Sequence, residues 1–159
     1  MRRAIYAGTF DPITNGHLDI VKRACRLFDE LVIAVAANPH KSPLFTWPQR
    51  QQMVKQSVAG VKSVRVVAFK GLLVDLVEKY RAVAIIRGLR AVSDFEFEFQ
   101  MALMNRELNS QAETMYLMPS AEYIYVSSTI IKNVAAHGGS VKRFVPKHVE
   151  ESLKKRVKK

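Results

Sequence analysis

The 159-residue sequence is poor in cysteine and lacks long apolar runs, and each absence excludes a class of protein. The single Cys25 cannot form an internal disulfide, which excludes a disulfide-stapled secreted domain. With only four scattered histidines beside it, a structural zinc site is disfavoured. No stretch approaches the roughly 20 apolar residues of a transmembrane helix, and the first residues lack a signal-peptide pattern. We therefore expect a cytoplasmic protein with no membrane partner, in which Cys25 is a buried thiol.

Several common catalytic signatures are also missing. The chain has neither a GxxxxGK[ST] phosphate loop nor a GxGxxG dinucleotide fingerprint. No serine stands in the context of a nucleophile elbow, and no carboxylate pair in a Gly-rich context suggests glycosidase chemistry. No cluster of carboxylates marks a metal cage, so we predict no metal ligands in the protein itself.

Acidic residues are scarce beside basic ones, with 14 Asp+Glu against 25 Lys+Arg and a formal net charge of +11. Such an excess favours polyanionic partners, either nucleic acid or phosphorylated small molecules. Part of the excess lies in the tail at 154–159, which we expect to be solvated. An RNA-binding module is the alternative from another functional class, but aromatic residues are not interleaved with the basic ones as a binding platform requires. We therefore expect no nucleic-acid partner.

What the chain does have is a regular alternation of strands and helices. Strand-like apolar segments recur at 3–7, 30–37, 63–69, 82–86 and 113–118. Helical patterns lie between and after them, at 17–28, 46–59, from Gly71 onward, at 93–108, at 127–136 and from Pro146 onward. This order predicts a single α/β domain over 1–159, a Rossmann-like doubly wound five-stranded parallel sheet with helices on both faces. Ligands of such sheets bind beyond the carboxyl ends of the strands.

Local signals mark several of these helices. Thr46 with Gln49, and Ser93 with Glu96, each have the spacing of a capping box and predict helix starts. The helix after Gly71 is expected to bury Leu72, Leu73, Leu76 and Val77.

The stretch at 7–17, Ala-Gly-Thr-Phe-Asp-Pro-Ile-Thr-Asn-Gly-His, joins the first strand to the first helix. Gly8 and Gly16 can let the backbone approach a ligand, and a helix N-terminus offers N–H groups to an anion. His17 is expected in the first helical turn, where the helix dipole and a ring donor could share one phosphate. The alternative is an ordinary strand-to-helix turn with a surface histidine.

Polar residues follow other strands at the same predicted edge. The segment 87–90, Arg-Gly-Leu-Arg, carries two guanidinium groups suited to phosphate; the alternative is two exposed arginines paired with Asp94 or Glu96. Lys41 lies in a proline-flanked loop after the second strand. Three consecutive hydroxyls at 127–129 suggest a second anion site, although plain capping needs only one of them.

Five segments together carry a resemblance to a known family: 8–17, the loop with Lys41, 86–98, 117–120 and 123–129. Thr14-Asn15-Gly16-His17 is similar to the T/H-x-G-H signature of the nucleotidyltransferase superfamily, and the whole set resembles the bacterial phosphopantetheine adenylyltransferases. The resemblance implies transfer of the adenylyl group of ATP to 4′-phosphopantetheine, by direct in-line attack without a covalent enzyme intermediate. It also implies the products dephospho-CoA and pyrophosphate, the penultimate step of coenzyme A synthesis, Mg²⁺ as cofactor, a homohexamer, and CoA as a candidate inhibitor.

The resemblance also assigns roles to individual residues. His17 would stabilise charge on the ATP α-phosphate in the transition state, with Thr9 and Lys41 acting beside it. Phosphopantetheine would be bound by Thr9, Lys41, Leu73 and Arg87. ATP would be bound by Thr9, Phe10, His17, Gly88, Leu89, Arg90, Glu98, Tyr123, Ile124, Tyr125, Val126, Ser127, Ser128 and Thr129.

A sister nucleotidyltransferase that acts on another phosphorylated acceptor, such as nicotinate mononucleotide, is the close alternative. The segments Arg-Gly-Leu-Arg at 87–90 and Ser-Asp-Phe-Glu-Phe-Glu at 93–98 argue against it. Lys132 stands where wider members of the superfamily carry arginine.

Overall fold

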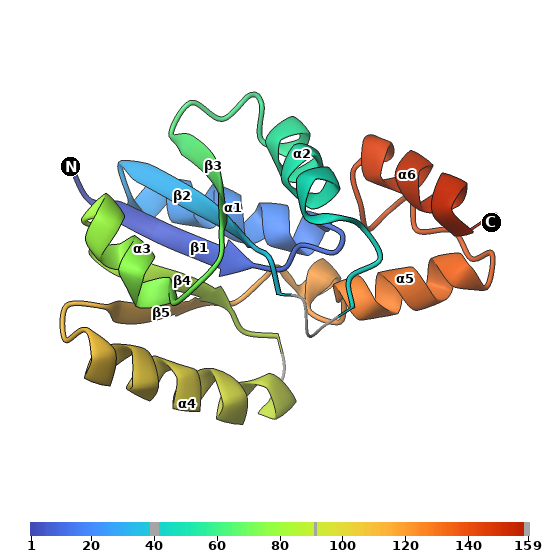
Figure 1. Ribbon diagram of the computed structural model, residues 1–159. Coiled ribbons are helices and arrows are strands. Elements are labelled where there is room, and N and C mark those ends of the chain that lie inside the picture. The colour runs from blue at the N-terminus through green and yellow to red at the C-terminus, as the bar shows by residue number, and fades with distance from the viewer. Residues whose placement is uncertain (39–41, 91, 158–159) are drawn as a thin grey trace.

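The computed structural model describes residues 1–38, 42–90 and 92–157. Figure 1 shows one twisted sheet flanked by helices. The strands are β1 (Arg3–Gly8), β2 (Glu30–Ala36), β3 (Val64–Phe69), β4 (Ala84–Gly88) and β5 (Glu113–Leu117). They lie in the order β3-β2-β1-β4-β5, and every neighbouring pair is parallel. The predicted Rossmann-like, doubly wound sheet is confirmed, because the strand order reverses direction at β1.

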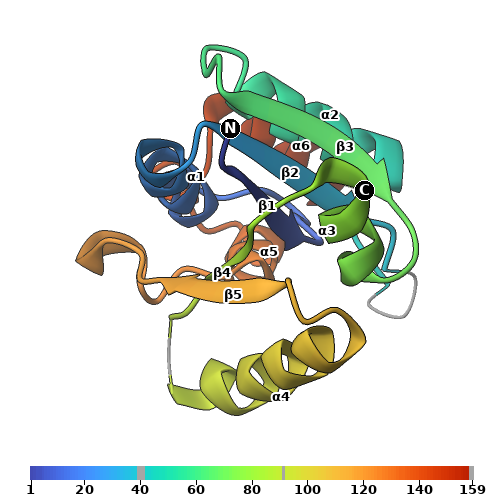
Figure 2. The same cartoon turned by 90° about the vertical axis from the view of Figure 1, so that its left-hand side faces the viewer.

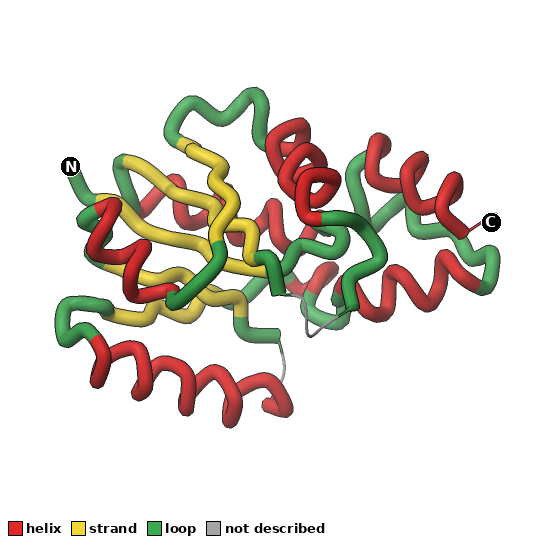
Figure 3. Tube along the Cα trace, in the orientation of Figure 1, coloured by secondary structure: helices red, strands yellow, loops and turns green. Residues whose placement is uncertain are grey.

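Helices cover both faces of the sheet. They are α1 (Asn15–Leu27), α2 (Trp47–Ser57), α3 (Leu73–Tyr80), α4 (Val92–Leu108), α5 (Ser128–Ala136) and α6 (Lys147–Val157), with a short 3-10 turn at Ala121–Tyr123. Figure 2 shows α1 and α2 on one side of the sheet and α3 on the other. In Figure 3, which has the orientation of Figure 1, the carboxyl ends of β1 and β2 point toward the side of the molecule on which α5 and α6 lie.

Each face of the sheet has its own buried cluster. On β1, Ala4 and Tyr6 pack toward α1 and α2, whereas Ile5 and Ala7 pack toward α3. Because β1 and β2 are covered on both faces, their sequences are almost continuously apolar rather than alternating. No helix within the described residues is long and apolar enough to cross a membrane.

Helix α4 differs from the other helices in how little of it is buried. None of its described apolar residues belongs to either buried cluster. Figures 1 and 2 show it alongside β5, at the edge of the sheet. Large apolar side chains on it are exposed to solvent, among them Phe95, Phe97, Phe99, Met101, Leu103, Met104 and Leu108. A single copy of the chain thus leaves a broad apolar face uncovered.

Two predicted boundaries near the ligand edge are wrong. The fourth strand runs from Ala84 to Gly88 rather than from 82 to 86. Arg87 and Gly88 belong to it because they pair with Tyr116 and Leu117 of β5, a tertiary constraint that local apolarity does not reveal. Helix α4 begins at Val92, so Ser93 lies inside the helix and cannot be its N-cap.

Other local predictions have mixed outcomes. The Thr46–Gln49 capping box is confirmed, with the Thr46 N–H donating to Gln49 Oε1 at 2.9 Å. Leu72 is 56% exposed because it is the extended N-cap of α3, outside the buried stripe of that helix. Cys25 is half-buried at the margin of the core rather than buried, because α1 turns Ile20, Val21 and Ala24 inward instead.

Candidate active site

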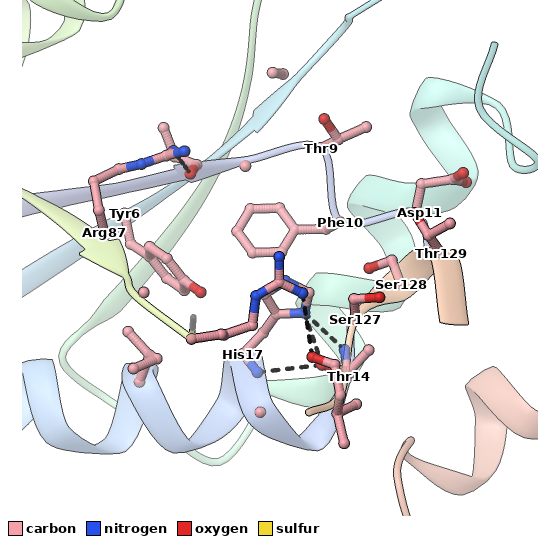
Figure 4. Close-up of a pocket in the computed structure, with 18 of the residues that line it drawn as sticks. Tyr6, Thr9, Phe10, Asp11, Thr14, His17, Arg87, Ser127, Ser128 and Thr129 are labelled. Carbon is pink, nitrogen blue, oxygen red and sulfur yellow. Dashed lines mark hydrogen bonds between the residues drawn. The ribbon is translucent and has the colours of Figure 1, made fainter. Parts of the chain in front are cut away.

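A pocket of about 970 Å³ lies where the carboxyl ends of β1 and β4 meet the N-termini of α1 and α5. Figure 4 shows residues from these separate segments facing one space. The pocket is lined by thirteen of the residues that the sequence singles out: Thr9, Phe10, His17, Leu73, Arg87, Gly88, Arg90, Glu98, Tyr123, Val126, Ser127, Ser128 and Thr129. The fold therefore brings segments from both halves of the sequence to a single site.

A few predicted residues are not part of the pocket lining. Leu89, Ile124 and Tyr125 are absent from it. Tyr125 is 60% exposed, and its ring packs edge-on against Phe144 at 6.0 Å between centroids. Lys41 lies outside the described residues.

His17 lies in the first turn of α1, where a reciprocal cap with Thr14 fixes its ring. The Thr14 N–H donates to His17 Nδ1 at 3.0 Å, and the Thr14 hydroxyl accepts from the His17 N–H at 3.3 Å. Because a main-chain N–H can only donate, Nδ1 must be unprotonated, and the proton of the neutral ring is on Nε2. The ring is also packed edge-on against Phe10, with 5.2 Å between centroids.

The charge state of His17 follows from its surroundings. Burial disfavours the imidazolium, and the positive charges of Arg90 and Arg87 add to this, so the pKa of His17 falls to about 4. His17 is therefore neutral near pH 7. It can donate one hydrogen bond from Nε2, but it does not contribute a full positive charge to the pocket.

The two glycines of the opening stretch make room for side chains. A Cβ atom at Gly8 would lie 3.0 Å from Cζ of Phe10, and one at Gly16 would lie 3.3 Å from Cβ of Tyr123. Phe10 itself has a positive φ of 48°, an uncommon conformation for a bulky residue, and its ring is buried. The glycines thus allow the β1–α1 turn and the 123–129 segment to pack closely around the pocket.

Arg87 is held by a carboxylate. Its Nε and Nη2 donate to the two oxygens of Glu98 at 2.7 and 2.5 Å, and Nη1 donates to the Ala7 carbonyl at 2.8 Å. Burial alone would lower the pKa of Arg87, but its hydrogen bonds with Glu98 and the negative charge there raise it overall. The alternative interpretation from the sequence paired the arginines of 87–90 with Asp94 or Glu96. In the structure, the carboxylate partner of Arg87 is Glu98 instead. Nearby, Arg90 Nη1 donates to the Val126 carbonyl at 3.4 Å.

The three hydroxyls at the start of α5 have different partners. Ser127 is the N-cap and accepts from the Ile130 N–H at 3.1 Å, as the simpler interpretation predicts. The Ser128 hydroxyl donates to the Pro12 carbonyl at 2.8 Å and so ties α5 to the β1–α1 turn. Thr129 lines the pocket.

Sequence reasoning missed an ion pair at the pocket wall. Asp11 is 4% exposed and accepts from Lys132 Nζ at 2.6 Å; both residues line the pocket. Asp11 also accepts from the N–H groups of Leu44 and Phe45, each at 2.9 Å. The only sequence signals are an aspartate within a strand-to-helix turn and a lysine three residues after the hydroxyl run. Neither signal predicts a buried partner.

The pocket carboxylates that could contact a metal already have cationic partners. Asp11 pairs with Lys132 and Glu98 with Arg87. Within the described part of the chain, no group of three or more His, Cys, Asp or Glu residues is placed to hold an ion. This donor set does not fit a resident Mg²⁺.

Comparison with known proteins adds independent information. A family model described as cytidylyltransferase-like matches residues 5–134. A phosphopantetheine adenylyltransferase of Opitutus terrae is 53% identical over 153 residues, 96% of each chain. One of Thermodesulfovibrio yellowstonii is 50% identical over 159 residues, 99% of each chain.

Among solved structures, the fold is similar to that of "a Putative Nicotinate-nucleotide Adenylyltransferase from Vibrio parahaemolyticus". The TM-score is 0.75 at 19% identity, over 99% of this chain and 95% of that one. At this level of identity the likeness supports the fold alone.

Proposed function

Since this chain belongs to the cytidylyltransferase-like family and, within it, to the phosphopantetheine adenylyltransferases, we propose that its pocket holds ATP and 4′-phosphopantetheine side by side. The enzyme transfers the adenylyl group between them, giving dephospho-CoA and pyrophosphate in the penultimate step of coenzyme A synthesis. One observation supports the two-substrate site above all others. Thr9, His17, Arg90 and the start of α5 line a single cavity with Leu73 and Arg87.

The chemistry requires two anions to be held in line. An oxygen of the phosphopantetheine phosphate attacks the α-phosphorus of ATP, the bond to the bridging oxygen breaks, and pyrophosphate leaves with the electron pair. No protein nucleophile is needed. The enzyme contributes position and electrostatic stabilisation, which can lower such a barrier by several kcal/mol.

His17 is the group best placed to act in the transition state. Its neutral ring presents an Nε2–H donor, held in orientation by Thr14 at Nδ1. In our proposal this donor binds an oxygen of the ATP α-phosphate as negative charge builds on it. Thr9 binds the acceptor phosphate beside it, and Lys41 acts there too.

The remaining assignments divide the pocket between the substrates. Leu73 and Arg87 bind phosphopantetheine, with the Arg87 guanidinium pre-oriented by Glu98. ATP is bound by Phe10, Gly88, Arg90 and the 123–129 segment. Leu89 and Glu98 also belong to the ATP set proposed from the resemblance.

Mg²⁺ enters as part of the substrate. Because the pocket carboxylates are paired with Lys132 and Arg87, we propose that the ion arrives on the ATP phosphates rather than in a protein cage. No step of the transfer is assigned to a metal ligand of the chain.

We also propose self-association through α4 and the neighbouring surface of β5. Large apolar side chains of α4 are exposed, and so are Met115 on β5 and Met118 just after it. Exposed apolar residues in such number favour a protein partner over water. Six copies is the number that the resemblance implies. CoA carries both a pantetheine arm and an adenosine diphosphate, so it would compete for both halves of the pocket as an inhibitor. A cytoplasmic location is compatible with the lone thiol Cys25.

The direct test is pyrophosphate release from Mg·ATP with a set of acceptors. We expect turnover with 4′-phosphopantetheine and none above background with nicotinate mononucleotide. Turnover with nicotinate mononucleotide but not with 4′-phosphopantetheine would instead assign the chain to the nucleotidyltransferases that act on that mononucleotide. Absence of turnover with either acceptor, combined with tight RNA binding at about 150 mM salt, would contradict the enzyme assignment.

A further inference from the structure

Arg50, on α2, is a buried cation outside the pocket lining. Arg50 is only 1% exposed and has one of the largest fully buried side chains in the protein. It donates to four main-chain carbonyls: from Nη1 to Thr9 at 2.6 Å and to Ala36 at 2.7 Å, from Nη2 to Ala37 at 2.9 Å, and from Nε to Phe45 at 3.2 Å. Moving a guanidinium out of water costs free energy even when neutral carbonyls satisfy its donors, so this arrangement calls for a reason.

The four carbonyls come from three separate segments that meet behind the pocket. Thr9 follows β1, Ala36 is the last residue of β2 with Ala37 directly after it, and Phe45 precedes α2. One planar guanidinium, with its donors in a fixed fork, therefore joins the carboxyl ends of two neighbouring strands. A lysine ammonium has three donors on a single atom and cannot span the same set.

Two of these carbonyls lead directly into strained residues. Phe10 follows Thr9 with φ of 48°, and Asn38 follows Ala37 with φ of 41°. Left-handed backbone is unfavourable for residues other than glycine, more so for phenylalanine than for asparagine, so at Phe10 it persists only where neighbouring contacts hold it. Across the two turns, Asn38 Nδ2 donates to Thr9 Oγ1 at 3.1 Å, which orients the hydroxyl that faces the pocket.

Asp11 completes the arrangement from the other side. It accepts from the Phe45 N–H, while Arg50 binds the Phe45 carbonyl, so the two buried charges hold the same residue. Asp11 is in turn the partner of Lys132 at the pocket wall.

We propose that Arg50 is a positioning residue of the adenylyl transfer, which acts by holding the main chain at Thr9 and Ala37 so that the Thr9 and Asn38 side chains meet at the reacting phosphates. The proposal rests on the proposed function, because it needs a reaction at Thr9. Arg50 touches no substrate. Displacing a reacting group by about 1 Å can cost about 10²-fold in rate, so losing the fork should slow the chemical step rather than weaken nucleotide binding.

The test compares Arg50→Lys with Val54→Ala, which lies one turn later on α2 and is also fully buried. Both variants lose core interactions, so their thermal midpoints should fall, and kinetics are measured well below both midpoints. We expect kcat of Arg50→Lys to fall at least tenfold while the Kd of ATP stays within about threefold. Val54→Ala should keep kcat within twofold. An equal kcat in the two variants would mean that Arg50 only stabilises the fold and would overturn the proposal.

A double-mutant cycle asks whether the effect passes through Thr9. If it does, Arg50→Lys should slow the wild-type enzyme at least tenfold but a Thr9→Ala enzyme less than threefold. If Arg50→Lys instead lowers kcat by the same factor in the wild-type and Thr9→Ala enzymes, the two residues act independently and the proposal is contradicted. Should Arg50→Lys not fold, Arg50→Gln replaces it, and failure of both to fold would assign Arg50 to stability alone. Wild-type enzyme without turnover would instead contradict the proposed function, so the two failures are distinct.

Discussion

The two loops that flank the pocket are built in different ways. The turn after β1 is braced within the chain: Thr14 caps and orients His17, Asp11 pairs with Lys132, and Arg50 holds the Thr9 carbonyl. The segment after β4 leads into α4, which buries little and is joined to β4 through the Arg87–Glu98 pair.

This difference suggests a division of labour. The groups that we propose to act in the transition state, His17 and Thr9, lie on the β1 side, where buried neighbours in the same chain fix their positions. The β4 side presents a charged pair to the pocket and an apolar helix face to the outside. We infer that chemistry depends mainly on contacts within one subunit, whereas the α4 side depends on association with further copies.

Removing His17 should have the largest effect on kcat, because it takes away the donor that we propose to bind the α-phosphate in the transition state. His17→Ala should lower kcat by about 10²–10³-fold, the usual loss for one transition-state donor. ATP affinity measured by calorimetry should stay within about tenfold, because the hydrogen bond strengthens only as charge builds. His137→Ala, which removes an exposed histidine at the end of α5, serves as the control and should be neutral. Equal losses in kcat and in ATP affinity would make His17 a ground-state ligand.

Introducing charges on the exposed face of α4 tests whether this helix is the contact between copies of the chain. Phe97→Glu combined with Met104→Glu should weaken self-association by about 30-fold or more, as expected where buried apolar anchors are lost. Sedimentation velocity measures the distribution of species, and circular dichroism should show folded monomers. Glu151→Lys, an exposed change on α6, should leave the assembly intact. An unchanged oligomer in the double variant would exclude α4 as the contact.

Breaking the Arg87–Glu98 pair should cost stability of the β4 side. Glu98→Gln leaves the half-buried Arg87 with a neutral partner, and we expect the free energy of unfolding to fall by about 2 kcal/mol. Urea denaturation measures this change. Glu113→Gln is the matched control, because its pair with Arg106 is exposed and should contribute less than 1 kcal/mol. A smaller loss for Glu98→Gln than for Glu113→Gln would contradict the structural role given to this pair.

The depressed pKa of His17 predicts a smaller, pH-dependent effect. In the unfolded chain His17 titrates near 6.5 and in the folded chain near 4, so the unfolded state binds the proton first as pH falls. His17 therefore destabilises the fold progressively between pH 6.5 and 4 and has no such effect above that window. His17→Gln should flatten the fall of unfolding free energy across this range, whereas His137→Gln should not. Parallel pH curves for wild type and His17→Gln would contradict the lowered pKa.

Much of the fold was predictable because strands covered on both faces are read from local apolarity alone. The sheet, its parallel direction and the capping box at Thr46 follow from such local signals. Boundaries set by pairing did not follow: Arg87 and Gly88 look like a loop until β5 supplies their partners. Leu72 looks like a buried residue in an apolar run until the start of α3 places it at an extended cap.

The pocket was predictable in outline for a similar reason, since polar residues after parallel strands collect at one edge. The buried supports behind it were not. Arg50 lies in the polar run Pro-Gln-Arg-Gln-Gln, which predicts a solvated helix face, and its acceptors are main-chain carbonyls that leave no trace in side-chain patterns. Asp11 is likewise defined by partners more than 30 and 120 residues away.

Direct transfer between two positioned phosphates predicts a definite stereochemical course at the α-phosphorus, which can be measured. One diastereomer of adenosine 5′-O-(1-thiotriphosphate) is incubated with 4′-phosphopantetheine, and the configuration of the thio-substituted dephospho-CoA is determined by ³¹P NMR. A single in-line displacement predicts complete inversion. Retention would require two displacements through a covalent adenylyl-enzyme and would exclude direct transfer.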